Sequence, residues 1–171
     1  MSKKGISNHR LTTGLIVAVW LCVTLFLLES VGIHSGWPAF LTLMFFTISG
    51  GKMEKLKDIF LGGAAGLIMA RLLVVGVEVL VPMGLAMRLS IFIMVFITVF
   101  LLIILEDISH MIFNSYSFGY FTVALVPAQQ STIEWLLTLF IGGAFFVGGI
   151  IIISRSLAKL KAAKLGKVEE A

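Results

Sequence analysis

One arginine lies inside a long apolar run, where a charged side chain is costly. Arg71 is near the centre of the run Ile59–Val81, and Glu78 follows seven residues later on the same helix face. A central arginine costs at least about 2.5–3.5 kcal/mol on membrane-insertion scales, so we expect Arg71 to face protein or a water-filled cavity. The pair predicts an anion or dipole site in a solute pathway. The alternatives are a structural ion pair of Arg71 with Glu78, Glu29 or an acid on the inner side, or a contact between subunits.

Two pairs of small polar residues stand at the starts of two apolar segments. His34 and Ser35 precede the segment Trp37–Ser49, and Asn114 and Ser115 occupy the matching positions 80 residues later. Free backbone N–H groups and the helix dipole at such a start favour an anion or a carbonyl dipole. Ordinary N-capping of the two helices explains the same residues.

Hydroxyl and aromatic side chains follow in both segments. Thr42 and Thr122 lie about two helical turns beyond the polar pairs. The aromatic residues nearby are Trp37, Tyr116, Phe118 and Tyr120. They predict a polar path with aromatic constrictions. Hydroxyls bonded back to their own helix and aromatic belts at the membrane interface are the alternatives.

An acidic cluster with one histidine follows the fourth apolar run. Glu106 and His110 are four residues apart, which places two potential metal ligands on one helix face, and Asp107 lies between them. Because no partner His or Cys motif accompanies them, we expect a solvated helix end, with no metal or other cofactor. Nucleophilic triads, phosphate-binding loops and dinucleotide fingerprints are absent from the sequence, so we do not expect an enzyme.

The elements that must position these residues are apolar. Of 171 residues, 59% are hydrophobic and 13% are charged, and the mean hydropathy is +1.09. A soluble domain of this length could not bury so much apolar surface. The segments that we expect to be transmembrane helices are Leu11–Val31, Trp37–Ser49, Ile59–Val81, Leu89–Leu105, Met111–Ala128 and Ile133–Ser154.

The basic residues predict the orientation. With six crossings, eleven of them fall on one side of the membrane: Lys3, Lys4, Arg10, Lys52, Lys55, Lys57, Arg155, Lys159, Lys161, Lys164 and Lys167. This positive-inside pattern predicts cytoplasmic termini, and it explains the net charge of +4 without nucleic-acid binding. We interpret the first run as an uncleaved span, because no A-x-A-like cleavage site follows it. Cys22 is the single cysteine, so no intrachain disulfide is expected.

An internal repeat relates the two halves of the chain. A shift of 80 residues, without a gap, aligns eight identities in the window 35–64, including Thr42 with Thr122 and Glu54 with Glu134. The glycine-rich stretch Gly62–Ala64 aligns with Gly142–Ala144, and we expect it to serve close helix packing. Because each half holds three spans, the second half enters the membrane from the opposite side. Inverted repeats are the architecture of many transporters and channels.

We therefore expect an all-α membrane protein, with six transmembrane helices as two inverted three-helix repeats. Residues 1–171 form one membrane domain, with repeats at about 11–81 and 89–155 and a basic cytoplasmic tail at 156–171. The expected function is a channel or facilitator for a small polar solute or small anion, such as urea or another amide, ammonia or a small carboxylate. A coupled secondary transporter that uses Arg71 and Glu78, and a membrane assembly protein, remain alternatives. The expected partners are the lipid bilayer, the solute and further copies of the chain in a homo-oligomer.

Four stretches of the chain also carry a family resemblance. They are Trp37–Phe40, Gly50–Lys52, Phe118–Phe121 and Trp135–Gly149. On these stretches the chain resembles small bacterial inner-membrane proteins that form the domain of unknown function 1097, over roughly residues 11–155. The resemblance implies a location in the bacterial inner membrane. It implies no catalytic residues, because the family has no assigned chemistry.

Overall fold

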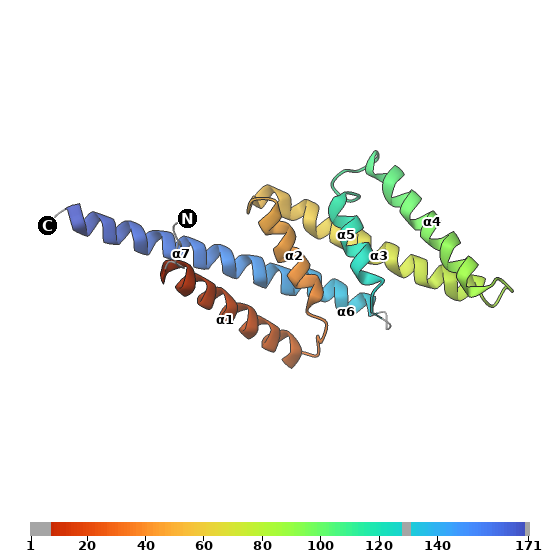
Figure 1. Cartoon of the computed structure of the whole chain (residues 1–171), viewed down its shortest axis with the longest axis horizontal. Coiled ribbons are helices and arrows are strands. Elements are labelled where there is room, and N and C mark those ends of the chain that lie inside the picture. Colours follow the sequence, from red (N-terminus) through yellow and green to blue (C-terminus); the bar gives the residue numbers. More distant parts are fainter. Residues whose placement is uncertain (1–7, 128–130, 170–171) are drawn as a thin grey trace, which may run out of the picture.

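The computed structural model describes residues 8–127 and 131–169, and every regular element within these residues is helical (Figure 1). The long helices are α1 (Asn8–Ser30), α3 (Leu56–Leu80), α4 (Met87–Glu106) and α7 (Gly143–Glu169). The short helices are α2 (Trp37–Ile48), α5 (Ser115–Ala124) and α6 (Thr132–Leu137). A 3₁₀ turn, η1 (Met53–Lys55), precedes α3, and a π-helical segment, η2 (Thr138–Gly142), joins α6 to α7. The expected all-helical fold class is confirmed for the described residues.

Within the described residues, four stretches of helix, rather than six, have the length and composition to cross a membrane. They are Leu11–Ser30, Met53–Leu80, Met87–Glu106 and Thr132–Lys159. By contrast, α2 has 12 residues and α5 has 10. At a rise of about 1.5 Å per residue they are roughly 18 and 15 Å long, about half of a 30 Å hydrocarbon core. The second and fifth apolar segments are therefore half-length helices.

Helix α5 starts later than the predicted segment, because the side chain of Asn114 caps the helix at that position. The expected run started at Met111, but the helix starts at Ser115. Asn114 Oδ1 accepts the backbone N–H groups of Tyr116 and Ser117, and the Ser117 hydroxyl accepts the Asn114 N–H. This reciprocal capping box fixes the first turn. The apolar residues before Asn114 form a turn after α4. Hydropathy alone does not distinguish such a turn from a helix.

The end of α2 is set by two glycines. Gly50 and Gly51 have φ angles of 75° and 70°, a left-handed conformation that side chains with a Cβ rarely adopt. The Gly51 N–H donates to the Phe46 carbonyl and closes the helix. The chain can then reverse into η1 and α3 within a few residues.

The two half-length helices pack on opposite partners. Helix α5 lies mainly against α3, and α4 also packs on α3. Helix α2 lies mainly against α7 and η2, and α1 also packs on α7. Figure 1 shows these two groups side by side, with α2 and α5 between the long helices. The third helix of each half of the sequence thus packs against the half-length helix of the other half.

Paired glycines in α3 and at the η2–α7 junction leave room for the half-length helices to pack closely. A Cβ atom on Gly63 would lie 2.9 Å from the Tyr120 ring, and one on Gly143 would lie 2.8 Å from the Thr42 hydroxyl. These glycines therefore serve packing between segments from different halves of the chain, in agreement with the close helix packing predicted from the sequence.

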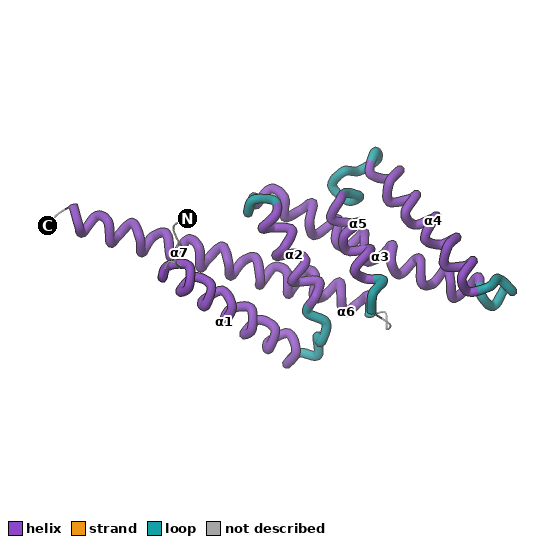
Figure 2. Tube along the Cα trace, in the orientation of Figure 1, coloured by secondary structure: helices purple, strands orange, loops and turns teal. Residues whose placement is uncertain are grey.

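The helix connections gather at two margins of the molecule. In Figure 2 the α2–α3 and α4–α5 connections lie along the upper side, and the α1–α2 and α3–α4 connections lie along the lower and right side. Arg155 of α7 lines a depression with Gly50 and Gly51, so it shares an end of the molecule with the α2–α3 turn. Lys3 and Lys4 of the predicted cytoplasmic set lie outside the described residues.

Candidate functional site

A buried pair of hydroxyl groups joins the two half-length helices. Thr42 Oγ1 and the Tyr120 hydroxyl are 2.6 Å apart, and both are fully buried. Each also lies within hydrogen-bonding distance of the Pro38 carbonyl oxygen, at 2.9 Å from Thr42 and 3.1 Å from Tyr120. The structure thus brings together two predicted site residues that are 78 positions apart.

Five aromatic rings form a column through this pair. The order is Trp135, Trp37, Tyr120, Phe45 and Tyr116, with successive centroid distances of 5.2, 6.3, 5.7 and 5.1 Å. We call these five residues the aromatic column. Trp135 and Tyr120 are buried, whereas Trp37, Phe45 and Tyr116 are partly buried. Of the aromatic residues proposed as constrictions, Trp37, Tyr116 and Tyr120 belong to the column, and Phe118 lies apart from it with 47% of its surface exposed.

The start of α2 is held by a carboxylate from α6. Glu134 Oε1 accepts the backbone N–H groups of His34 and Ser35, both at 2.7 Å. The sequence predicted that free N–H groups here would favour an anion. In the structure a carboxylate of the chain itself occupies that position.

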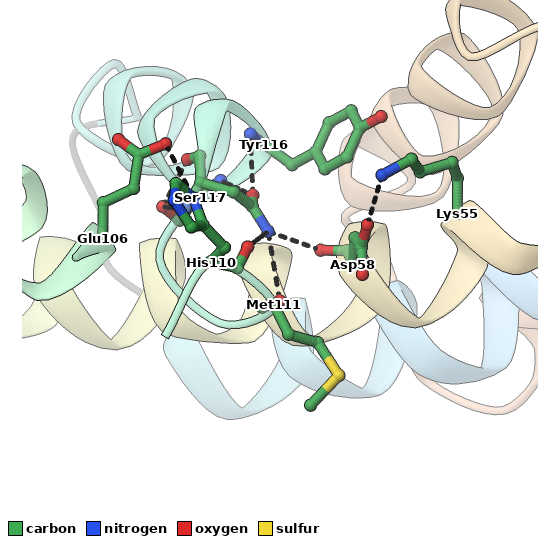
Figure 3. Close-up of polar contacts among 8 residues, drawn as sticks. Lys55, Asp58, Glu106, His110, Met111, Tyr116 and Ser117 are labelled. Atoms are coloured by element: carbon green, nitrogen blue, oxygen red, sulfur yellow. Dashed lines mark hydrogen bonds and ion pairs between the residues drawn. The ribbon is translucent and has the colours of Figure 1, made fainter. Parts of the chain in front are cut away.

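The start of α5 is closed by its own cap. Besides the capping box, Asn114 Nδ2 donates to the Asp58 carbonyl at 3.1 Å, which ties the α4–α5 connection to α3. The capping interpretation therefore describes Asn114, and Ser115 is exposed beside it. Figure 3 shows the surrounding ion pairs, Lys55 with Asp58 at 2.8 Å and His110 with Glu106 at 3.5 Å.

An open depression reaches the Tyr116 end of the column, and a second depression lies at the start of α6. The Asp58 depression, of about 720 Å³, reaches Tyr116. Its other lining residues are Ile48, Lys55, Asp58, Glu106, His110, Met111, Asn114 and Ser115. The Arg71 depression, of about 360 Å³, is lined by Arg71, Ser131, Thr132, Ile133 and Glu134, next to Trp135 in the sequence. Each depression contains side chains of both charge signs.

Two predicted site residues lie away from the column. Thr122 is exposed and its hydroxyl donates to the Phe118 carbonyl, the back-bonding that was the alternative interpretation. Arg71 lines its depression, and its Nη1 lies 3.9 Å from Glu78 Oε1. Both of these charged side chains are substantially exposed, at 43% and 60%.

The geometry of the Arg71–Glu78 pair leads to a stability prediction. The two charged groups are 3.9 Å apart, at the limit of an ion pair, and Arg71 lines an open depression, so Arg71→Met should change the free energy of unfolding by about 1 kcal/mol or less. Thermal unfolding in mild detergent measures this. A larger loss for Arg71→Met that Glu78→Gln partly restores would show instead that the pair is structural.

Sequence reasoning missed three participants: Glu134, Trp135 and Phe45. Glu134 aligned with Glu54 in the repeat, and that identity was the available signal. Trp135 and Phe45 carried no such repeat identity, and an aromatic residue in an apolar segment can serve many roles. Among the described residues, no three His, Cys, Asp or Glu side chains come together in an arrangement that could hold a metal ion.

Comparison with known proteins identifies one relationship. A family model described as "Protein of unknown function (DUF1097)" matches residues 10–155. The comparison with curated proteins found no match. The comparison with solved structures found none either.

Proposed function

The chain belongs to the DUF1097 family, and we propose that it is a membrane channel or facilitator for a small neutral polar solute of the amide class. The observation that carries the proposal is the aromatic column. It runs between the two half-length helices, contains a buried hydroxyl pair, and has an open depression at its Tyr116 end. Pathways at the interface of short helices near the bilayer midplane are typical of transport proteins with inverted repeats.

Inverted symmetry of the two halves is part of the proposal. The order long, short, long occurs twice, and α1, α2 and α3 correspond to α4, α5 and α6–α7. Phe60 and Phe140, 80 residues apart, stack on each other with centroids 5.8 Å apart and ring planes 12° apart. Two equivalent residues touch in this way when a pseudo-two-fold axis passes between them, which supports the symmetry.

We propose six crossings for this arrangement. We propose that α2 and α5, each with its connecting loop, complete a crossing that neither helix spans alone. Arg155 and the α2–α3 turn share one end of the molecule, which supports a cytoplasmic side that carries the basic residues. The bacterial inner membrane, with both termini cytoplasmic, is the location that we propose.

The side chains of the column favour a neutral solute over an anion. The column carries hydroxyl and indole groups but no ionisable acid or base other than its tyrosines. An ion there would lose its hydration without a counter-charge, at a cost of several kcal/mol. A planar amide can stack between rings and form hydrogen bonds with their polar edges. The Arg71–Glu78 pair lies outside the column, so we place a coupled transporter second.

Solute flux into proteoliposomes tests the proposal. In a Cys22→Ser background, we expect acetamide and urea to enter faster than into empty liposomes, and formate not to. Tyr116→Cys, at the Asp58 depression, should lose this flux after reaction with a bulky thiol reagent. The control Ser156→Cys, exposed on α7, should keep it.

Three results would contradict the proposal. Equal rates with and without protein for every solute would exclude a facilitator. Formate flux without amide flux would identify an anion channel. Uphill accumulation driven by an ion gradient would identify a coupled transporter.

A further inference from the structure

One hydrogen-bond donor in the column has no partner among the described residues. Among the buried side-chain nitrogen and oxygen atoms of the described residues, Trp37 Nε1 and Thr132 Oγ1 are the two without a hydrogen bond. Buried polar groups in proteins are almost always paired, so an unpaired one calls for an explanation. A bound molecule that supplies an acceptor is one such explanation.

The position of Trp37 points to a ligand rather than to a packing fault. Its ring lies between Trp135, at 5.2 Å, and Tyr120, at 6.3 Å. The nearby hydroxyls of Tyr120 and Thr42 already bond to each other and to the Pro38 carbonyl. The indole N–H therefore stays buried without a hydrogen-bond acceptor among the described residues. The second unpaired atom belongs to Thr132, a residue that lines the Arg71 depression.

We propose that the Trp37 indole N–H binds the carbonyl oxygen of a small neutral amide in the column. The indole is a donor only, so its partner must be an acceptor, and a carbonyl oxygen is a strong neutral one. The aromatic neighbours of Trp37 suit a planar molecule. This inference rests on the proposed function and assigns the residue that recognises the solute.

Trp20 provides a matched control. Its Nε1 donates to the Phe145 carbonyl at 3.1 Å, so its donor is already occupied within the protein. Indole N–H resonances of the ¹⁵N-labelled full chain in detergent report on each tryptophan separately. Trp37→Phe and Trp20→Phe identify the two signals by their loss.

Titration with acetamide should move the Trp37 signal and leave the Trp20 signal in place. Thioacetamide has nearly the same shape but a weaker acceptor, so it should move the Trp37 signal less. In proteoliposomes, Trp37→Phe should reduce the preference for acetamide over thioacetamide by roughly three- to tenfold, the effect of one hydrogen bond. Trp20→Phe should leave that preference unchanged.

The outcomes separate this inference from the proposed function. A Trp37 signal that does not respond to acetamide, together with unchanged selectivity in Trp37→Phe, overturns the inference even if the wild-type protein conducts amides. A Trp37 signal that responds in a protein without any flux supports the amide site and rejects the facilitator. Equal movement of the Trp37 and Trp20 signals indicates a solvent effect and overturns the inference.

Discussion

Replacing Gly66 by alanine should destabilise the protein by about 3 kcal/mol, because the added methyl group has no room between α3 and α5. A Cβ atom at Gly66 would collide with the Ser117 carbonyl oxygen and lie 2.9 Å from the Phe121 nitrogen. Both of these atoms are backbone, so no side-chain rotation relieves the clash. The helices must move apart, which would disturb Tyr120 and the column. Thermal or denaturant unfolding in detergent measures the loss.

Two further alanine substitutions calibrate this result. At Gly76 the nearest atoms belong to the side chain of Met94, which is flexible, so Gly76→Ala should cost less. At Gly148 no atom lies within 4 Å, so alanine should stabilise α7 by about 0.5–1 kcal/mol through its higher helix propensity. If Gly66→Ala proves no more harmful than Gly76→Ala, the close α3–α5 crossing is wrong.

Hydropathy predicted the all-helical class and the order of the long helices. A run of apolar residues must be helical in lipid, whatever its partners, so the positions of the long helices follow from composition. Half-length helices are harder to predict, because hydropathy does not distinguish a helix from an apolar turn beside it. Met111–Phe113 shows this, since only the Asn114 cap separates the turn from α5.

Part of the candidate site could be predicted, because the polar and aromatic residues of the two half-length helices stood out in the sequence. Thr42, Tyr120, Trp37 and Tyr116 all lie in or beside the column. Equal positions in the repeat did not imply equal surroundings, however. Thr42 is buried against Tyr120, whereas its counterpart Thr122 is exposed on α5. Side-chain burial depends on which helix faces the residue, and a pairwise alignment of two halves does not contain that information.

The contact between Glu134 and the start of α2 was beyond sequence reasoning for a related reason. It joins residues about 100 positions apart, through backbone N–H groups that are the same for every residue type. No side-chain pattern at His34 or Ser35 identifies the acceptor. The repeat alignment of Glu134 with Glu54 drew attention to both glutamates without indicating which of them has a structural role.

Glu134→Leu should therefore lower the free energy of unfolding by about 1–3 kcal/mol, because two backbone N–H groups lose a charged acceptor. Glu134→Gln should cost less, since its amide oxygen can still accept both hydrogen bonds. Glu54, the repeat counterpart, is exposed before α3, so Glu54→Leu is the matched control and should have little effect. Unfolding of the three variants in the same detergent gives the comparison.

The Glu134 series also tests how the site is held together. Glu134 lies in the Arg71 depression and next to Trp135, whose ring contacts Trp37 at the start of α2. Loss of the carboxylate should therefore loosen α2 relative to α6 and broaden the Trp37 indole signal, while the Trp20 signal stays sharp. If Glu134→Leu and Glu54→Leu reduce stability equally, the hydrogen bonds to His34 and Ser35 do not hold α2, and the column needs another support at this end.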